Sequence, residues 1–219
     1  MFKERIMDIS KRNELSHIGS NLSAVDIIDA VYGIKKPTER FVLSSGHTGL
    51  ALYTVLESHG LGNAEEMLEK AGIHADKKAS EFVDVSTGSL GQGLPIAVGM
   101  ALAERNKNVY CLVSDEEMAE GSIWEALRVA TENNLTNLKV ICNFNGWAAY
   151  RQTDANRIIN MVKATGWTVV EINGHDKNTI ESLLKYDHSD LNGMMFILAH
   201  TKSDFDNVTG QDAHYSKLK

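Results

Sequence analysis

Acidic and amide side chains stand directly after two apolar stretches of the sequence. Asp115 follows the stretch 108–114, and Asn145 follows the stretch 138–144. Asn145 lies thirty positions after Asp115, about one strand–helix–strand unit, so adjacent parallel strands would bring the two side chains together. Carboxylate and amide oxygens suit Mg2+, which binds hard oxygen ligands. The same residues also fit a helix cap at Asp115 and an Asx turn at Asn145 with Gly146, so both interpretations remain open.

A glycine-rich stretch, STGSLGQG at 86–93, leads into a helical pattern. Its backbone N–H groups, with the positive end of a helix dipole behind them, suit a phosphate or the close approach of a ring. Glycine turns are common, so this stretch alone is weak evidence for a ligand. Together with the ends of two strands, it gives three polar segments that can converge on one crevice at the carboxyl edge of a parallel sheet.

Five short apolar stretches, rich in Val, Ile and Leu, predict strands that are covered on both faces. They are 40–45, 108–114, 138–144, 168–172 and 194–200. Helical periodicity predicts helices at 23–33, 48–60, 90–106, 121–134, 155–166 and 178–186, the first of them capped by Ser23. This alternation predicts a single α/β domain over residues 1–219, with a doubly wound, mostly parallel sheet of five to six strands and helices on both faces.

The composition suits one globular domain with a substantial core, since 43% of the 219 residues are hydrophobic and 23% are charged. A formal charge of −7 argues against nucleic acid and against an anionic membrane surface as partners. The sequence shows no signal peptide and no apolar run near the ~18 residues that span a bilayer. Cys111 and Cys142 lie in apolar stretches without CxxC spacing, which indicates buried free thiols in a reducing, cytoplasmic protein.

Several segments, in a consistent order, resemble the N-terminal, diphosphate-binding domain of transketolases, in the form found as a small subunit of split transketolases. These segments are 16–33, 40–60, 86–106, 114–126 and 142–147. The resemblance runs nearly end to end, and it implies thiamine diphosphate with Mg2+ or Ca2+ and the transfer of two-carbon ketol units between sugar phosphates. The alternatives are a 1-deoxyxylulose-phosphate-synthase-like or specialised sugar-biosynthetic enzyme, and a non-catalytic relative that only binds a partner.

The resemblance also assigns roles to residues at matching positions. The implied metal ligands are Asp115, Asn145 and the main-chain carbonyl of Trp147. The implied cofactor-binding residues are His47, Gly88, Leu90, Ser114, Asp115, Glu116, Asn145 and His214. The implied catalytic residues are His17, His47, His74 and His214, together with Glu120 and Glu125, which match glutamates thought to link paired active sites across the family's subunit interface.

The sequence departs from the family pattern beside the expected metal. The family reads Gly-Asp-Gly where this chain reads Ser114-Asp115-Glu116, so Glu116 places a carboxylate next to an anionic ligand. At close range this repulsion would amount to ~1 kcal/mol or more and would weaken cofactor binding. Asn143 stands where the family commonly has an acidic residue, which removes one nearby charge. The segment around His74 also departs, since it lies one residue out of step with the glycine-rich stretch.

The resemblance further implies that this chain is catalytically incomplete. In the family, a glutamate activates the aminopyrimidine of the cofactor, and that glutamate belongs to a following pyrimidine-binding domain. A chain of 219 residues has no room for the pyrimidine-binding and C-terminal domains. We therefore expect a separate subunit to carry them, in an α2β2 heterotetramer with the cofactor at the interface. A fragment or a degenerate relative is the alternative.

Overall fold

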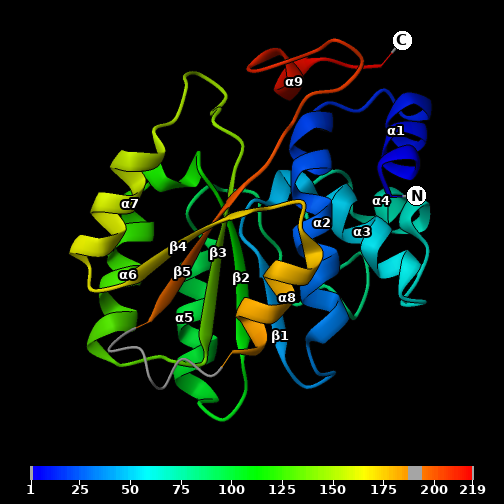
Figure 1. Ribbon diagram of the computed structural model, residues 1–219. Coiled ribbons are helices and arrows are strands. Elements are labelled where there is room, and N and C mark those ends of the chain that lie inside the picture. The colour runs from blue at the N-terminus through cyan, green and yellow to red at the C-terminus, as the bar shows by residue number, and fades with distance from the viewer. Residues whose placement is uncertain (1, 187–193, 219) are drawn as a thin grey trace.

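A parallel five-stranded sheet forms the centre of the molecule (Figure 1). The computed structural model describes residues 2–186 and 194–218, and within them the strand order is β1-β2-β3-β5-β4. The strands are β1 (Arg40–Leu43), β2 (Val109–Ser114), β3 (Leu138–Phe144), β4 (Thr168–Asn173) and β5 (Met195–His200). All four pairings are parallel, which confirms the predicted α/β fold. The predicted domain range also includes residues 1, 187–193 and 219, which lie outside the described residues.

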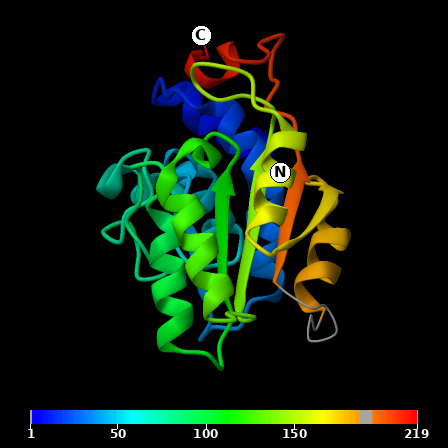
Figure 2. The same cartoon turned by 90° about the vertical axis from the view of Figure 1, so that its left-hand side faces the viewer.

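Helices cover both faces of the sheet. The helices on one face are α1 (Phe2–Arg12), α2 (Ile18–Ile34), α3 (Gly49–Ser58), α4 (Ala64–Ala71) and α8 (Lys177–Lys185). Those on the other face are α5 (Gly93–Ala103), α6 (Gly121–Glu132) and α7 (Ala155–Ala164), drawn in green and yellow in Figure 2. A short last helix, α9 (Asp212–Tyr215), contacts α2. None of the described helices is both long and apolar enough to cross a bilayer.

The alternation of side chains along β2 explains why its sequence is apolar throughout. Tyr110 and Leu112 join the hydrophobic cluster that contains α2 and α3, whereas Cys111 and Val113 join the cluster that contains α5 and α6. A strand covered on both faces has no solvent-facing positions, so a continuous apolar run results. Cys111 is a buried free thiol, as is Cys142 on β3, and both predictions are confirmed.

The start of α2 corrects the predicted helix cap. The helix begins at Ile18, so Ser23 lies inside it and is fully buried instead of capping its first turn. A polar side chain is tolerated there because Ser23 Oγ donates to the Ser20 carbonyl (2.9 Å) and accepts from Asn143 Nδ2 on β3 (2.9 Å). Helices α1 and α4 were likewise not among the predicted elements.

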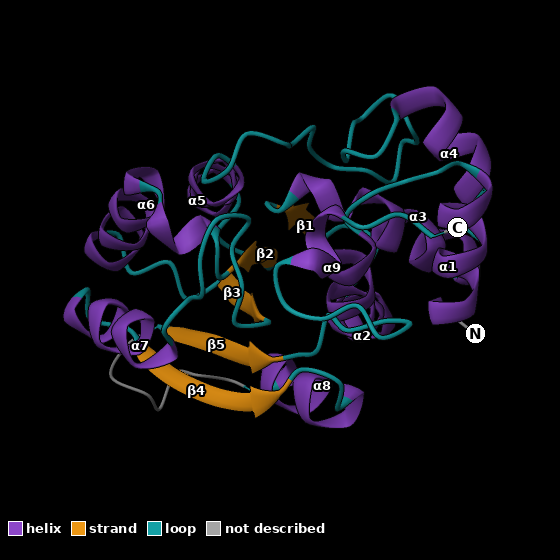
Figure 3. Cartoon of the chain, turned by 90° about the horizontal axis from the view of Figure 1, so that it is seen from above, coloured by secondary structure: helices purple, strands orange, loops and turns teal. Residues whose placement is uncertain are grey.

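Residues 201–218, which include His214, fold back beside the start of α2, above the carboxyl edge of the sheet (Figures 1 and 3). We call this segment the C-terminal strap. Ala213 of the strap is buried, and a Cβ added at Gly19 on α2 would lie 2.8 Å from the Ala213 Cβ. This approach is too close for any side chain at Gly19. The strap thereby brings His214 to the first turn of α2.

Candidate active site

The carboxyl ends of β1, β2 and β3 carry the polar segments that the sequence singled out. The 3-10 turn η1 (Gly46–Thr48) follows β1 and contains His47. The register pairs Ser114 at the end of β2 with Asn143 on β3, and Asp115 N donates to the Asn143 carbonyl (3.1 Å). The prediction that the spacing brings the ends of these two strands together is therefore confirmed.

Asp115 is 3% exposed, and only one of its carboxylate oxygens is hydrogen-bonded. Oδ2 accepts from Gly146 N (2.9 Å) and from Thr153 Oγ1 (2.5 Å), whereas the buried Oδ1 has no partner. Burial raises the pKa of Asp115 to about 7. Buried polar atoms in native proteins are nearly always paired, so this oxygen fits a cation that binds there. The helix-cap interpretation is wrong, because the carboxylate binds the loop after β3 instead of a helix start.

Asn145 and Trp147 lie in the loop that Asp115 contacts. Asn145 Oδ1 accepts from Trp147 N (2.9 Å), an Asx turn in which Gly146 has a left-handed φ of 85°. The predicted turn is confirmed, and it leaves a second lone pair on Oδ1 for another partner. Within residues 2–186 and 194–218, no group of three or more His, Cys, Asp or Glu side chains is arranged for a metal. A cation here would therefore draw on amide, carbonyl and ligand oxygens as well as Asp115, which suits Mg2+ or Ca2+.

Three histidines from distant parts of the sequence meet at this end of the molecule. The ring centroid of His17 lies 5.4 Å from that of His47 and 4.5 Å from that of His214. The centroids of His47 and His214 are 5.7 Å apart. His17 N donates to the His214 carbonyl (3.0 Å), and His17 has a left-handed φ of 62°, which is strained for a non-glycine residue. His74 is exposed, and its Cδ2 would lie 3.1 Å from a Cβ added at Gly88.

Burial keeps the histidine cluster neutral near pH 7. Burial, assisted by the neighbouring histidines, lowers the pKa of His47 to about 3 and that of His17 to about 4. Burial also lowers the pKa of His214. A neutral imidazole has one N–H donor and one lone pair, so each ring can donate one hydrogen bond to a hydroxyl group and accept another.

The lowered pKa of His47 predicts a loss of stability at acid pH. A histidine whose pKa is lower in the folded chain than in the unfolded chain stabilises the fold fully above about pH 6.5, and this stabilisation is lost as the pH falls toward 3. From about pH 6 to about pH 4, the free energy of unfolding of the wild type should fall by about 1.3 kcal/mol per pH unit more than that of His47→Asn. Urea unfolding across this range measures the difference, and equal slopes would contradict the prediction.

The glycine-rich stretch packs against the turn after β1 more closely than side chains permit. A Cβ at Gly93 would lie 2.5 Å from Ser44, and a Cβ at Gly46 would lie 2.4 Å from a carbonyl oxygen of the stretch. Glycine is required at both positions because the two segments touch through their backbones. Gly88 and Leu90 are half-buried in this stretch. The stretch thus lies beside the turn that carries His47. It also meets the segment after β2, because Gly91 N donates to Glu117 (2.9 Å), as the prediction of converging segments requires.

The side chain of Glu116 lies beside Asp115. It is 7% exposed, and its Oε1 accepts from Ala149 N (3.0 Å) in the loop after β3. Burial raises the pKa of Asp115, and the charge of Glu116 raises it further. Burial lowers the pKa of His214, and the charge of Glu116 partly offsets this lowering. Among the described residues, no cationic side chain forms an ion pair with Glu116. An anionic ligand bound near Asp115 would therefore meet a carboxylate that has no ion-pair partner among the described residues.

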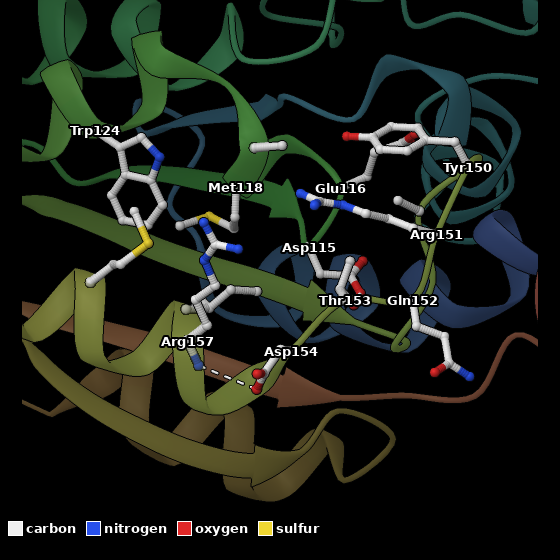
Figure 4. A pocket seen from close by; sticks show the side chains of 14 residues that line it. Asp115, Glu116, Met118, Trp124, Tyr150, Arg151, Gln152, Thr153, Asp154 and Arg157 are labelled. Atoms are coloured by element: carbon white, nitrogen blue, oxygen red, sulfur yellow. Dashed lines mark hydrogen bonds between the residues drawn. The ribbon is translucent and has the colours of Figure 1, made fainter.

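A pocket of about 200 Å3 opens beside these two carboxylates (Figure 4). Trp124 of α6 lies at one end of it and Tyr150 at the other. Arg151 and Arg157 line the same pocket, so guanidinium and carboxylate groups share one solvent-accessible space. Charges of both signs around one opening suit a polar ligand better than an apolar one.

The two glutamates expected at a subunit interface lie around α6. Glu120 precedes the helix and is half-buried, and Glu125 is exposed on it. Glu125 forms an ion pair with Arg128 on the same helix, an exposed pair that contributes little to stability. Their proposed role concerns a partner, so it stays a prediction.

Two further side chains near the site were not indicated by the sequence pattern. Asn21 on α2 donates from Nδ2 to the His17 carbonyl (2.8 Å) and accepts at Oδ1 from Ala51 N (2.8 Å), which ties the start of α2 to α3. Glu117, directly after Glu116, is completely buried. In the sequence, a glutamate within an acidic stretch looks like a solvent-exposed residue. Only the folded structure shows that Glu117 is buried.

Comparison with known proteins places the chain in a family. The family model described as "Transketolase, thiamine diphosphate binding domain" matches residues 6–219. One subunit of the apulose-4-phosphate transketolase of Phocaeicola vulgatus is 32% identical over 201 residues, covering 81% of this chain and 72% of that protein. The 6-deoxy-6-sulfo-D-fructose transketolase subunit SqwG of Clostridium sp. is 30% identical, covering 94% of this chain and 81% of that protein.

Longer relatives match over only part of their own length. Transketolase-like protein 2 of Bos taurus is 39% identical over 63% of this chain, which spans only 24% of that protein. A crystal structure of a transketolase variant from Pichia stipitis has a TM-score of 0.76 at 22% identity, covering 92% of this chain and 39% of that chain. At this identity the likeness shows a shared fold. From the family match and the two subunit relatives, the chain belongs to the transketolase family, in which it corresponds to the thiamine diphosphate-binding domain.

Proposed function

We propose that this chain is the N-terminal, diphosphate-binding subunit of a split, thiamine diphosphate-dependent transketolase. The observation that carries the proposal is the buried, unpaired Oδ1 of Asp115, at the carboxyl edge where neutral histidines gather. A metal ion with an anionic ligand would pair this oxygen, and substrate hydroxyl groups would meet the histidines. Two relatives that are named as transketolase subunits, and that the chain covers over most of their length, support the proposal.

The metal and the cofactor would be held by the loops after β2 and β3 and by the glycine-rich stretch. Asp115 and Asn145 would bind Mg2+ or Ca2+ through their side chains, and Trp147 through its carbonyl oxygen, to neutralise and orient the diphosphate. Gly88 and Leu90 would border the aminopyrimidine ring. When bound, thiamine diphosphate supplies the electron sink for breaking and forming the carbon–carbon bond.

The histidines would serve the sugar phosphate substrates. His17, His47 and His214 are neutral and adjacent, so each can donate one hydrogen bond to a substrate hydroxyl group and accept another. His74 is exposed beside the glycine-rich stretch, where it would meet a substrate that enters over the cofactor. The residues that select between sugar donors and acceptors would lie partly on the partner.

We also propose a separate subunit with the pyrimidine-binding and C-terminal domains, assembled with this chain as an α2β2 heterotetramer. Glu120 and Glu125 on the α6 side would lie near that interface. Residues 1–219 would then act as one diphosphate-binding domain. The two buried free cysteines support a reducing, cytoplasmic location.

One observation favours a second candidate function. Glu116 places a buried carboxylate, without an ion-pair partner among the described residues, beside the expected diphosphate site, and it opposes an anionic cofactor. A relative that has lost cofactor binding, and that acts only by binding its partner, would tolerate such a residue. Calorimetric titration of the assembled complex with thiamine diphosphate and Mg2+ separates the two candidates, because only the enzyme binds the cofactor.

In the enzyme, replacement of Glu116 should strengthen cofactor binding. Glu116→Gln removes the charge and keeps the acceptor for Ala149 N, and Glu116→Gly also restores the family residue. Each should lower the dissociation constant of thiamine diphosphate about fivefold, as a repulsion of ~1 kcal/mol implies. Glu104→Gln, which changes an exposed glutamate after α5, is the matched control. Weaker binding by Glu116→Gln would contradict the repulsion, and no binding by wild type and variants alike would contradict the proposed function.

A further inference from the structure

Glu117 lies in the short 3-10 turn η2 (Glu117–Ala119) after β2, and its side chain is completely buried. Its Oε1 accepts from Ser44 Oγ (2.5 Å) and from Gly91 N (2.9 Å), and its Oε2 accepts from Ser114 N (2.9 Å). In the described part of the chain, no cationic side chain forms an ion pair with it. This carboxylate is therefore held by hydrogen-bond donors alone.

The donors come from three segments of the candidate site: the turn after β1, the glycine-rich stretch and the end of β2. Ser44 follows β1 and begins the turn to His47, 73 residues before Glu117 in the sequence. Gly91 belongs to the glycine-rich stretch, 26 residues before it, and Ser114 directly precedes Asp115. A single buried carboxylate thus connects the ends of two strands and the glycine-rich stretch.

We propose that Glu117 is a positioning residue that fixes these three cofactor-binding segments relative to one another. The proposal rests on the proposed function, since the segments matter through the cofactor that they would bind. Glu117 does not itself need to touch cofactor or substrate. A buried carboxylate is unfavourable unless donors surround it, so the three segments must keep their arrangement for Glu117 to stay paired.

Glutamine cannot replace this carboxylate, because one of its two terminal groups is an NH2 donor. If the NH2 group pointed toward Gly91, it would face a backbone N–H that can only donate. If the NH2 group pointed toward Ser114, it would face the backbone N–H of Ser114, which also can only donate. In either orientation one backbone N–H loses its acceptor, and the segment that carries it is released.

Glu39 provides a matched control at the opposite, amino edge of the sheet. It is 5% exposed and accepts from Lys36 N (2.8 Å) and from Asn108 Nδ2 (3.0 Å). Glu39→Gln is thus a substitution of the same kind in a similarly buried place. Asn108 can turn its amide to accept from the new NH2 group, so this variant should keep its hydrogen bonds.

The experiment compares Glu117→Gln, Glu39→Gln and wild type by two measurements. Calorimetry with thiamine diphosphate and Mg2+ on the assembled complex should show at least about tenfold weaker binding for Glu117→Gln and less than about a twofold change for Glu39→Gln. In 1H–15N spectra of the chain, Glu117→Gln should shift the amide signals of Gly91, Ser114 and the turn after β1. Should Glu117→Gln fail to fold, Ser44→Ala removes one donor, and its binding should be about threefold weaker.

Unchanged cofactor affinity in folded Glu117→Gln, or in Ser44→Ala where that variant replaces it, would overturn the inference. A wild-type complex that binds no thiamine diphosphate would instead contradict the proposed function, and the spectra would then decide about Glu117. Shifts confined to the three segments would support the positioning role. Unshifted Gly91 and Ser114 amides would overturn it.

Discussion

Asp115→Asn is expected to lower the affinity of the assembled complex for thiamine diphosphate and Mg2+ by at least about 100-fold, because it removes the proposed charged ligand of the metal. The substitution keeps the shape of the side chain, and its oxygen can still accept from Gly146 N and Thr153 Oγ1. The NH2 group then takes the place of the unpaired Oδ1. An amide nitrogen there cannot bind a cation, so the loss follows from chemistry and not from misfolding.

The same variant should become more stable in the absence of metal. Burial raises the pKa of Asp115 to about 7, so its neutral form stabilises the fold at low pH, and this stabilisation is lost as the pH rises from about 4 to about 7. Above that range the ionised carboxylate is unfavourable in the fold. We expect the free energy of unfolding of Asp115→Asn at about pH 8 to exceed that of the wild type by about 1–2 kcal/mol.

Weaker cofactor binding together with a higher free energy of unfolding identifies a functional residue. Substitution of a purely structural residue would instead reduce both cofactor binding and stability. Asp176→Ala is the control, since Asp176 caps α8 by accepting from Thr179 N, and removal of this acceptor should reduce stability without changing cofactor binding. Cofactor affinity of Asp115→Asn within about threefold of the wild type would contradict the metal assignment.

The strands could be predicted because burial on both faces leaves a clear signal in sequence. The stretch 108–114 contains the whole of β2, and each residue of that strand is buried. The start of α2 could not be predicted in the same way. Its first turns contain small polar residues that resemble a loop, and Ser23 resembles a helix cap until its partner Asn143 on β3 is known.

In the candidate site, too, some features could be predicted from the sequence and others depend on tertiary packing. Adjacency of Asp115 and Asn145 follows from spacing, because one strand–helix–strand unit leads to a neighbouring parallel strand. The gathering of His17 and His214 could not follow from spacing, since it depends on the way the strap packs against Gly19. The buried state of Glu117 depends on partners as distant as Ser44, and no local pattern contains that information.

The isolated chain is expected to show no ketol transfer, and the addition of the pyrimidine-domain subunit should restore it by at least about 1000-fold. The general acid–base group that activates the cofactor contributes on the order of 100- to 10,000-fold, and the family resemblance assigns that group to the partner. The histidines of this chain cannot replace it. They are neutral, and their pKa values of about 3 and 4 at His47 and His17 make them weak bases at pH 7.

The test is a titration of this chain with the partner at fixed thiamine diphosphate, Mg2+ and sugar phosphate concentrations. Activity should rise to a plateau at one partner per chain of 24.1 kDa, and light scattering should show a heterotetramer at that point. Asp115→Asn should leave assembly unchanged and abolish the plateau activity, which separates binding of the partner from use of the cofactor. Turnover by the isolated chain would contradict the shared site, because it would place every required group on the residues of this one domain.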